Sequence, residues 1–563
     1  MNILGLSGVF DPTPSAALYV DNTLVAAAEE TSFRHIEGNQ DRTPLEAARF
    51  CLASANLCPE DIQVVAIPYA ETPLNSPARW QFAKRHWYSP KRSINAVLQG
   101  NLAFSQYKDE ITKLLQTLGI NASNIQFDTV DKHVAYASSA YHLSGFRSKT
   151  AIIGMGDQGE YASMFFGFGE HGRIHEIKQY YFPDCLSFLY DTMSSYFGFD
   201  GPNAVSSTIT LAAQGNPNRY DLSRLLHHEH GDVSVNTDYV NVSDNRRYQK
   251  DDRFYHFTRQ LVDWLGPVRD GKAELNPYSH YAASIQQLFE KTIVSLVKEN
   301  LGDIIDETGR LVFAGSGASN YKLNQTLLAQ PNIKHLWVPP TGHNALSAIG
   351  AATHACATQG IVANNLKHAF LGPTYTSKDC KAACEAHSET PHYKPLKHQA
   401  KEAARLLCET GSIAWFQGAM ELGNQASGAR SILTLLNHST TGLPPQPCRV
   451  SMLDHTADTM LNTSHRSAFF NMSYEIAETH RHHVTHLLQP DGTLLAQTVT
   501  QDYHPAFYAL LQEVEALTGI GAVLHSSLVT PNNTLATTPK DALDAFYQSE
   551  LSQLIMEDLL VTK

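Results

Sequence analysis

Two histidines, His133 and His142, lie in residues 131–142, DKHVAYASSAYH, among small and aromatic residues. An imidazole binds transition metals and gains or loses a proton near neutral pH. The segment therefore has two interpretations: a metal or proton-transfer site, or a packed part of the core. Which of the two holds decides how much metal chemistry the chain can perform.

Cys380, Cys384 and His387 are spaced at i, i+4 and i+7, so they would share one face of a helix. Cysteine and histidine side chains that converge can bind zinc. Small buried cysteines also pack well inside an amphipathic helix, and for an isolated pair this core interpretation is favoured. The histidine clusters at residues 227–230 and 480–486 lack clean spacing, and we interpret them as solvated loop residues.

Glycine-rich turns at residues 5–15, 155–160 and 314–324 each follow an apolar run. Backbone N–H groups in such turns can face a phosphate, although a plain tight turn has the same composition. In the third turn the glycines permit close approach, and an asparagine can cap the following helix. The candidate nucleotide-binding residues of this turn are Gly315, Gly317, Asn320 and Asn324.

The elements that must position these residues follow an α/β pattern. Residues 2–30 predict a strand followed by a hairpin, and residues 149–177 repeat the same order, which indicates duplicated halves. A long helix with one apolar face is predicted over residues 280–302, and a small-residue helix that can pack closely over residues 343–360. The Gly-Pro break in residues 370–379 predicts a domain boundary. We therefore expect one α/β domain over residues 1–368 and a second over residues 369–563.

Bulk composition excludes several classes of function. The chain has 563 residues, 43% of them hydrophobic, and a net charge of −13 without a long basic block, which argues against binding to nucleic acid. No apolar run is long enough to span a bilayer, so we expect no membrane insertion. The eight scattered cysteines are typical of a reduced, cytoplasmic protein.

Eight stretches, taken together and in order, resemble the NodU/CmcH family of carbamoyltransferases. They are ILGLSG, SAALYVDNTLVAAAEE, AYASSAY, AGSGASNYKLNQTL, PPTGHNALSAIGAA, IAWFQGAMELGNQASGARSIL, DGTLLAQTV and TPKDALDAF. The resemblance implies an N-terminal domain of the actin/Hsp70/sugar-kinase type and a C-terminal domain similar to threonylcarbamoyl-adenylate synthase. It also implies ATP and carbamoyl phosphate as donors, iron in the N-terminal domain, and a small-molecule acceptor.

At the implied iron site, the family's ligands are replaced in this sequence. The outer histidines of the family pattern HHxxHA fall on Lys132 and Tyr136, and its two aspartates fall on Gly156 and Asn344. A lysine cation repels a divalent metal, and a protonated phenol is a poor ligand. We therefore expect the metal site to be lost, with His133 and Asp157 as the remaining catalytic candidates. A new site built from His133, Asp157, His343 and Asn344 is the alternative.

The C-terminal donor site has lost the same kind of residue. Arginines of the family pattern become Ala419, Gln425 and Leu495. Bidentate guanidinium groups are the strong way to hold polyanions, and the loss of one electrostatic donor can cost on the order of a hundredfold in rate. The residues that persist there are Arg430, Ser431, Asp491, Thr493 and Ser527.

These replacements indicate a family member with a degenerate site. We expect it to act in carbamoylation of a natural-product hydroxyl or amine, either with an active paralogue or by altered chemistry. A stand-alone carbamoyltransferase dependent on ATP and carbamoyl phosphate, and an enzyme with different acyl or nucleotide chemistry, are the alternatives. A homodimer is a further expectation from the resemblance.

Overall fold

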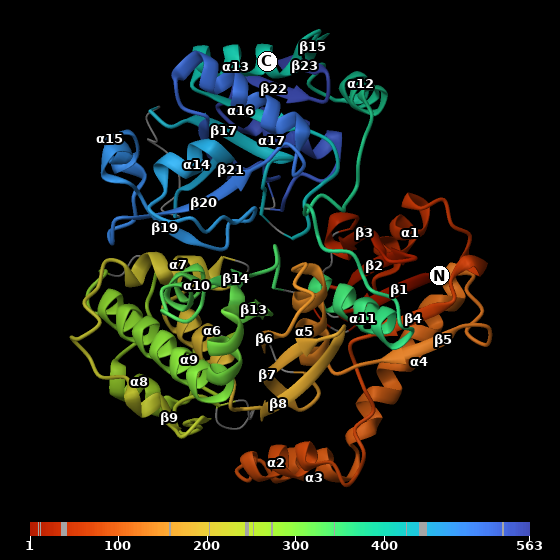
Figure 1. Ribbon diagram of the computed structural model, residues 1–563, viewed down its shortest axis with the longest axis vertical. Coiled ribbons are helices and arrows are strands. Elements are labelled where there is room, and N and C mark those ends of the chain that lie inside the picture. Colours follow the sequence, from red (N-terminus) through yellow and green to blue (C-terminus); the bar gives the residue numbers. More distant parts are fainter. Residues whose placement is uncertain are drawn as a thin grey trace. The chain divides into compact units, whose positions relative to one another are not determined.

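Figure 1 shows the chain as a computed structural model. It describes residues 1–9, 11, 13–34, 42–156, 159–201, 203–241, 247–250, 253–271, 274–342, 344–423, 425–437, 447–531 and 534–563. The chain forms two compact units, Met1–Val25 with Ile36–Asn365, and Ala26–His35 with Leu366–Lys563. The sequence did not indicate that Ala26–His35 joins the second unit, which it does in part through a hydrogen bond from the Ala27 amide to the Leu371 carbonyl (3.2 Å).

The first half of the N-terminal region is a five-stranded sheet with the order β3-β2-β1-β4-β5. The strands are β1 (Asn2–Ser7), β2 (Ser15–Val20), β3 (Thr23–Glu29), β4 (Val64–Ile67) and β5 (Gln126–Thr129). β1 pairs antiparallel with β2 and parallel with β4. The predicted hairpin turns at Asp21, whose φ of 54° is one that Asn and Asp adopt more readily than other side chains.

The second half repeats this topology with the order β14-β13-β6-β7-β8. Its strands are β6 (Thr150–Met155), β7 (Ala162–Glu170), β8 (Arg173–Tyr181), β13 (Arg310–Ala314) and β14 (His335–Trp337). In both sheets the first strand is central, the hairpin lies on one side and two parallel strands lie on the other. The predicted α/β class and the duplicated halves are thus confirmed.

Helices connect and cover these two sheets. They are α1 (Leu45–Ser54), α2 (Pro77–Arg85), α3 (Pro90–Leu98), α4 (Gly100–Leu118), α5 (Lys132–Leu143), α6 (Leu186–Tyr196), α7 (Ala204–Ala212), α8 (Arg259–Leu265), α9 (Tyr278–Thr308), α10 (Tyr321–Leu328) and α11 (Asn344–Thr358). α9 is the predicted long helix, and it ends where Gly309 adopts φ 67°.

Helices α5 and α11 pack on each other through small residues. A Cβ atom on Gly350 would lie 2.0 Å from the Ala135 carbonyl oxygen, and the hydroxyls of Ser138 and Thr353 are hydrogen-bonded at 2.9 Å. α5 also packs on β6 and β7, and α11 packs on β1 and β2. This close approach confirms the predicted small-residue helix, and it fixes α5 against α11 between the two sheets.

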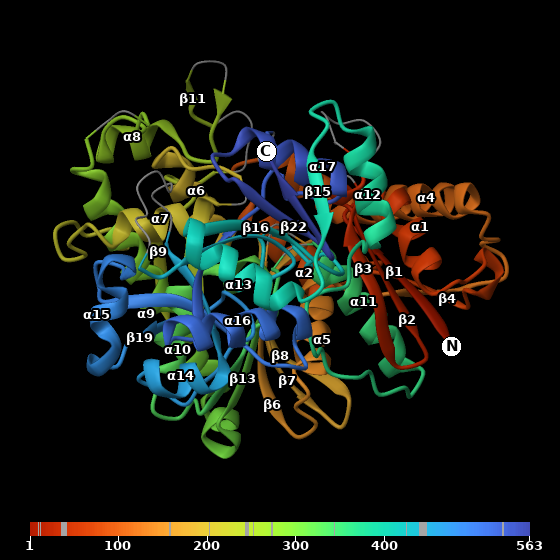
Figure 2. The ribbon, with the colours of Figure 1, turned by 90° about the horizontal axis from the view of Figure 1, so that it is seen from above.

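The second unit contains a mixed sheet of nine described strands with the order β15-β23-β22-β16-β17-β21-β18-β20-β19. The strands are β15 (His392–Pro395), β16 (Ser412–Phe416), β17 (Arg430–Leu435), β18 (Arg449–Leu453), β19 (Ser473–Glu475), β20 (Thr493–Val499), β21 (Ala522–Ser527), β22 (Gln553–Met556) and β23 (Leu559–Thr562). The helices are α12 (Ser377–Ala386), α13 (Gln399–Thr410), α14 (Asp454–Met460), α15 (Arg481–Val484), α16 (Pro505–Thr518) and α17 (Pro539–Gln548). α13 and α16 lie side by side over this sheet (Figure 2).

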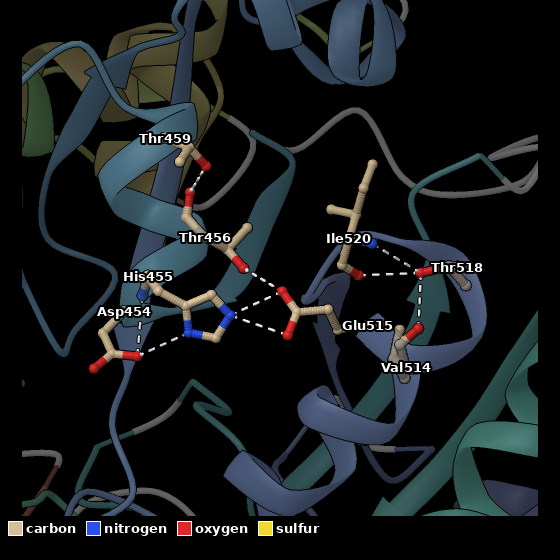
Figure 3. A network of polar contacts seen from close by, with 8 residues as sticks. All are labelled: Asp454, His455, Thr456, Thr459, Val514, Glu515, Thr518 and Ile520. Atoms are coloured by element: carbon tan, nitrogen blue, oxygen red, sulfur yellow. Dashed lines mark hydrogen bonds and ion pairs between the residues drawn. The ribbon is translucent and has the colours of Figure 1, made fainter.

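Surface polar contacts fasten α14 to α16. Figure 3 shows His455, whose Nε2 lies 2.8 Å from a carboxylate oxygen of Glu515 on α16. The hydrogen bond to Glu515 raises the pKa of His455 above its ordinary value. Because His455 is about half exposed, the pair adds little stability.

The two cysteines of α12 take the core role. Cys380 and Cys384 are buried against Phe416, Leu543 and other apolar residues of the second unit. His387 ends the helix and lies 3.2 Å from Asp544. The core interpretation of this pair is confirmed.

Two secondary-structure predictions fail at the histidine clusters. The loop assignment is wrong for residues 227–229, which lie in strand β9 (Leu226–Glu229), and for residues 481–484, which lie in α15. The predicted exposure to solvent is confirmed for His227 and His230. Within the described ranges, no helix has both the length and the apolar composition needed to cross a bilayer.

Candidate functional site

Helix α5 begins at the position that the sequence singled out. The Asp131 carboxylate accepts hydrogen bonds from the backbone amides of His133 (2.8 Å) and Val134 (3.3 Å), which caps the helix. His133 is fully buried, with Nδ1 3.7 Å from Asp131 Oδ1 and its ring edge-on to Tyr136. It is not among the residues that line the cavity described next.

Two of the replaced ligand positions fit against each other. Tyr136 is 1% exposed, and a Cβ atom placed on Gly156 would lie 2.5 Å from its ring carbon Cε2. Real Cβ atoms do not come this close to another heavy atom, so the ring and a side chain at position 156 exclude each other. The phenol therefore fills space that an aspartate at position 156 would need.

A cavity of about 80 Å³ lies at the ends of α5 and α11. It is much smaller than the several hundred Å³ of typical ligand pockets. Its lining includes Lys132 and Asn344, which the sequence predicted, and three carboxylates that it missed: Asp11, Asp131 and Glu160. Lys132 Nζ lies 3.5 Å from an Asp11 carboxylate oxygen, so an ion pair occupies the place where the resemblance puts an imidazole and a metal.

Glu160 has the most perturbed carboxyl of this cavity. Its pKa is raised to about 7, chiefly by burial and in smaller part by the nearby Asp131, while a hydrogen bond from the Thr72 hydroxyl (2.9 Å) opposes the rise. Its other oxygen, Oε1, is buried without a hydrogen-bond partner. A carboxyl that titrates near neutral pH beside a cavity can accept a proton from a hydroxyl or an amine.

We predict that Glu160→Gln stabilises the chain at pH 8 by about 2 kcal/mol and has little effect at pH 4. The folded-state pKa is raised from 4.5 to about 7, so the stability that the neutral carboxyl contributes is present below pH 4.5 and is lost as the pH rises through 7. Gln stays neutral and can still accept from Thr72. Urea unfolding at the two pH values measures the difference, and the exposed Glu274→Gln is the matched control. Equal effects at both pH values would contradict the assignment.

Two residues of the alternative metal site, Asp157 and His343, lie outside the described residues. Among the residues that are described, no group of three or more His, Cys, Asp or Glu side chains is arranged to hold a metal ion. The donors at the positions that the resemblance assigns to iron are an amine paired with Asp11, a buried phenol and a carboxamide. This set does not fit a transition metal.

The third glycine turn is packed tightly against β6. Gly315 has φ 96°, and a Cβ atom on it would lie 2.1 Å from the Met155 carbonyl oxygen. Asn320 caps α10 through the Leu323 amide (3.0 Å) as predicted, and it also bonds Gln286. A Cβ atom on Gly317 would lie 2.8 Å from the Met155 sulfur, and Asn324 donates to the Ala318 carbonyl at 2.8 Å. These contacts hold the turn in shape, and nucleotide binding stays a prediction.

In the second unit, Arg430 is fully buried and bonded to the backbone. Its guanidinium lies 3.8 Å from the centre of the Phe416 ring and donates to the carbonyl oxygens of Gln417 (2.9 Å), Gly418 (3.0 Å) and Pro373 (3.1 Å). Burial lowers its pKa to about 10, so it is still charged at neutral pH. These contacts direct the guanidinium toward the protein backbone.

The loop before Arg430 is organised by a carboxylate that the sequence did not single out. Glu421 Oε1 accepts from the four successive backbone amides of residues 427–430, at 2.8–3.2 Å. Consecutive amides of this kind form an anion-binding concavity. Here the protein's own carboxylate fills it.

The other donor-site residues fall on neighbouring strands. Ser431 and Ser527 are cross-strand partners on β17 and β21. The Ser431 hydroxyl bonds His525 Nε2 at 2.8 Å, and burial lowers the pKa of His525 to about 3. Asp491 forms a local turn by accepting from the amide (3.1 Å) and the hydroxyl (2.8 Å) of Thr493. The structure thus brings Ser431 and Ser527 together, whereas Asp491 lies in an exposed turn.

Two family descriptions match the chain. "Carbamoyltransferase N-terminus" matches residues 2–353, and "Carbamoyltransferase C-terminus" matches residues 404–563. An uncharacterised protein of Synechocystis sp. is 25% identical over 100% of this chain and 97% of its own length. Nodulation protein NolNO of Sinorhizobium fredii is 24% identical over 100% of this chain and 80% of its own length.

A solved structure of an activator of 2-hydroxyisocaproyl-CoA dehydratase from Clostridium difficile aligns with a TM-score of 0.34 and 14% identity, over 64% of this chain and 97% of that one. The two family descriptions together cover most of the chain, from residue 2 to residue 563. This chain belongs to the carbamoyltransferase family.

Proposed function

We propose that this chain acts in the carbamoylation of a small-molecule hydroxyl or amine without the iron and guanidinium chemistry that the resemblance implies. Membership of the carbamoyltransferase family supports the reaction class. Two relatives are named as nodulation proteins, NolNO and NolO. The observation that supports the altered mechanism is the fit of the Tyr136 ring against Gly156.

ATP is the proposed nucleotide, held by the backbone of residues 315–320. Backbone cradling does not depend on the arginines that the sequence has lost. The side chains of Asn320 and Asn324 bond the protein, and the amides of Ala318 and Asn320 bond the Gly315 and Gly317 carbonyls. A phosphate would therefore be held by other backbone N–H groups of the turn.

Two modes of action are consistent with this proposal. In the first, the chain works with an intact paralogue that supplies the donor chemistry. In the second, it acts by altered chemistry, with Glu160 receiving the proton that leaves the acceptor hydroxyl or amine. The buried Oε1 of Glu160 has no hydrogen-bond partner. This observation favours the second mode.

The test is to incubate the full chain with ATP, carbamoyl phosphate and iron, and to measure carbamoyl adenylate by mass spectrometry. We expect the chain alone to form it more slowly than an intact family member by at least a factor on the order of a hundred, because the loss of one electrostatic donor can cost that much and three arginine positions are replaced. Formation at a comparable rate would overturn the proposal. If an added intact paralogue restores carbamoylation of the acceptor, the first mode is supported. If the chain alone carbamoylates the acceptor and this activity depends on Glu160, the second mode is supported.

A further inference from the structure

Large apolar side chains are exposed together on one short segment of the first unit. Of the twelve such side chains found in the described part of the chain, six lie between residues 74 and 102. They are Leu74, Trp80, Trp87, Ile94, Leu98 and Leu102. The segment contains α2, α3 and the start of α4, and we call these six side chains the hairpin face. A concentration of this kind marks an interaction surface, whereas scattered exposed residues do not.

The segment is firmly folded on its inner side. Arg79 is 1% exposed and donates to the Val97 carbonyl (3.1 Å) and the Asn101 side chain (2.5 Å). Phe82 packs edge-on against Tyr161 with ring centres 5.4 Å apart. Figure 1 shows α2 and α3 side by side at the edge of the first unit. The apolar side chains of the hairpin face are therefore exposed by a defined structure.

An ion pair fixes the end of α2 to the body of the unit. The Arg85 guanidinium contacts both carboxylate oxygens of Asp184, at 2.5 and 2.7 Å. The pair is bidentate and about a third exposed at most, which makes it one of the stronger kinds of ion pair. The inner side of the hairpin is thus occupied by the protein, and only its outer side is available for a partner.

The charge of this segment is opposite to that of the whole chain. Residues 72–108 contain no Asp or Glu, although the chain has a net charge of −13. Their basic residues are Arg79, Lys84, Arg85, Lys91, Arg92 and Lys108. Lys84 and Lys91 are exposed and stand in the sequence between Trp80, Trp87 and Ile94 at spacings of three or four residues. Exposed lysines therefore alternate with exposed tryptophan and isoleucine along the hairpin.

We propose that the hairpin face docks on an anionic lipid surface, with its tryptophans at headgroup depth. Tryptophan with aliphatic residues on one face and lysine beside them is the composition of helices that lie in a membrane interface. Lysine stems can extend past the apolar side chains so that the ammonium groups reach lipid phosphates. A protein partner fits less well, because lysine is depleted from the cores of protein interfaces. The docking leaves the chain on the surface and does not require a spanning helix.

The test is flotation of the full chain with vesicles of phosphatidylcholine, with or without phosphatidylglycerol. We expect binding to the vesicles that contain phosphatidylglycerol, a blue shift of tryptophan emission, and weakening by salt. The double variant Trp80→Ser/Trp87→Ser should bind on the order of tenfold or more weakly, because two large apolar contacts are lost. Lys84→Glu/Lys91→Glu should remove the preference for phosphatidylglycerol. Leu517→Ser, which changes an exposed leucine on α16, is the matched control and should bind like the parent.

Three results would overturn the proposal. One is absence of binding by the parent chain, and another is binding that the tryptophan double variant retains in full. The third is a parent chain that does not bind vesicles but forms a dimer in sedimentation velocity, where the tryptophan double variant is a monomer. That result would assign the face to a second copy of the chain. Because the substituted side chains are exposed, the melting temperature of each variant should match that of the parent, and this verifies that a loss of binding is not a loss of fold.

Discussion

Arg430→Met is expected to lower the free energy of unfolding of the second unit by about 3–5 kcal/mol, the usual cost of breaking a buried charged network. Methionine can fill much of the volume beside Phe416, but it cannot donate a hydrogen bond. The carbonyl groups of Gln417, Gly418 and Pro373 would lose the guanidinium donors that now lie 2.9–3.1 Å away. Each buried acceptor left without a partner costs about 1–3 kcal/mol.

Hydrogen exchange measured by mass spectrometry shows whether the destabilisation is confined to the second unit. Peptides from β16 and β17 should exchange faster in the variant, and peptides from β1 and β6 should not change. The matched control is Arg405→Met on α13, because Arg405 is half exposed and pairs only with surface carboxylates; we expect a change below about 0.5 kcal/mol. A loss below about 1 kcal/mol for Arg430→Met would show that its contacts are dispensable, and the residue would then be available for a ligand.

The repeated topology of the first unit could be predicted because its signals are local. Each half opens with an apolar strand followed by a hairpin, and turn residues mark where the hairpin reverses, as Asp21 does in the first half. The small residues of α11 likewise carry their own information, because only glycine at position 350 permits the approach to the Ala135 carbonyl. Patterns of this kind depend on the near neighbours of each residue, so the sequence contains them.

The acidic cavity could not be predicted, because it depends on contacts between distant segments. Asp11, Asp131, Glu160 and Asn344 come from four separate segments of the chain and meet only when α5 and α11 pack between the sheets. One signal was present, since Glu160 is the last residue of the glycine turn predicted at residues 155–160. The identity of a side chain does not reveal its burial, and burial is what raises the pKa of Glu160.

Arg430 illustrates a different limit. A retained arginine in a family pattern suggests an anion site, yet the environment that decides its role is made by the loop at residues 417–430 and by Pro373. In that loop Glu421 accepts hydrogen bonds from four backbone amides, and its carboxylate adds a negative charge near the guanidinium. The partners of a buried charge follow from the tertiary structure, so the sequence pattern alone leaves its role open.

The ligand positions of the implied iron site are linked by shape as well as by chemistry. Gly156 is compatible with Tyr136 because it has no side chain, and Tyr136 is compatible with the site because no aspartate is present. The Lys132 ammonium is stabilised by its ion pair with Asp11. In a site that held a metal ion in place of this ammonium, Asp11 would be a further negative charge facing the metal. Restoring one ligand alone therefore conflicts with the other three replacements.

We predict that the fourfold variant Lys132→His, Tyr136→His, Gly156→Asp and Asn344→Asp binds about one iron or cobalt ion per chain, whereas the parent binds substoichiometric amounts. Two imidazoles and two carboxylates form a donor set that suits these metals, and removal of the phenol ring makes room for the aspartate. Metal analysis after dialysis and the visible spectrum of the cobalt form give the stoichiometry and the coordination. The control keeps Tyr136 and changes the other three positions. It should be destabilised and metal-free, because a Cβ atom at position 156 would lie 2.5 Å from the ring. A folded fourfold variant without metal, or a parent that binds iron equally well, would show that these four positions do not form the site that the resemblance implies.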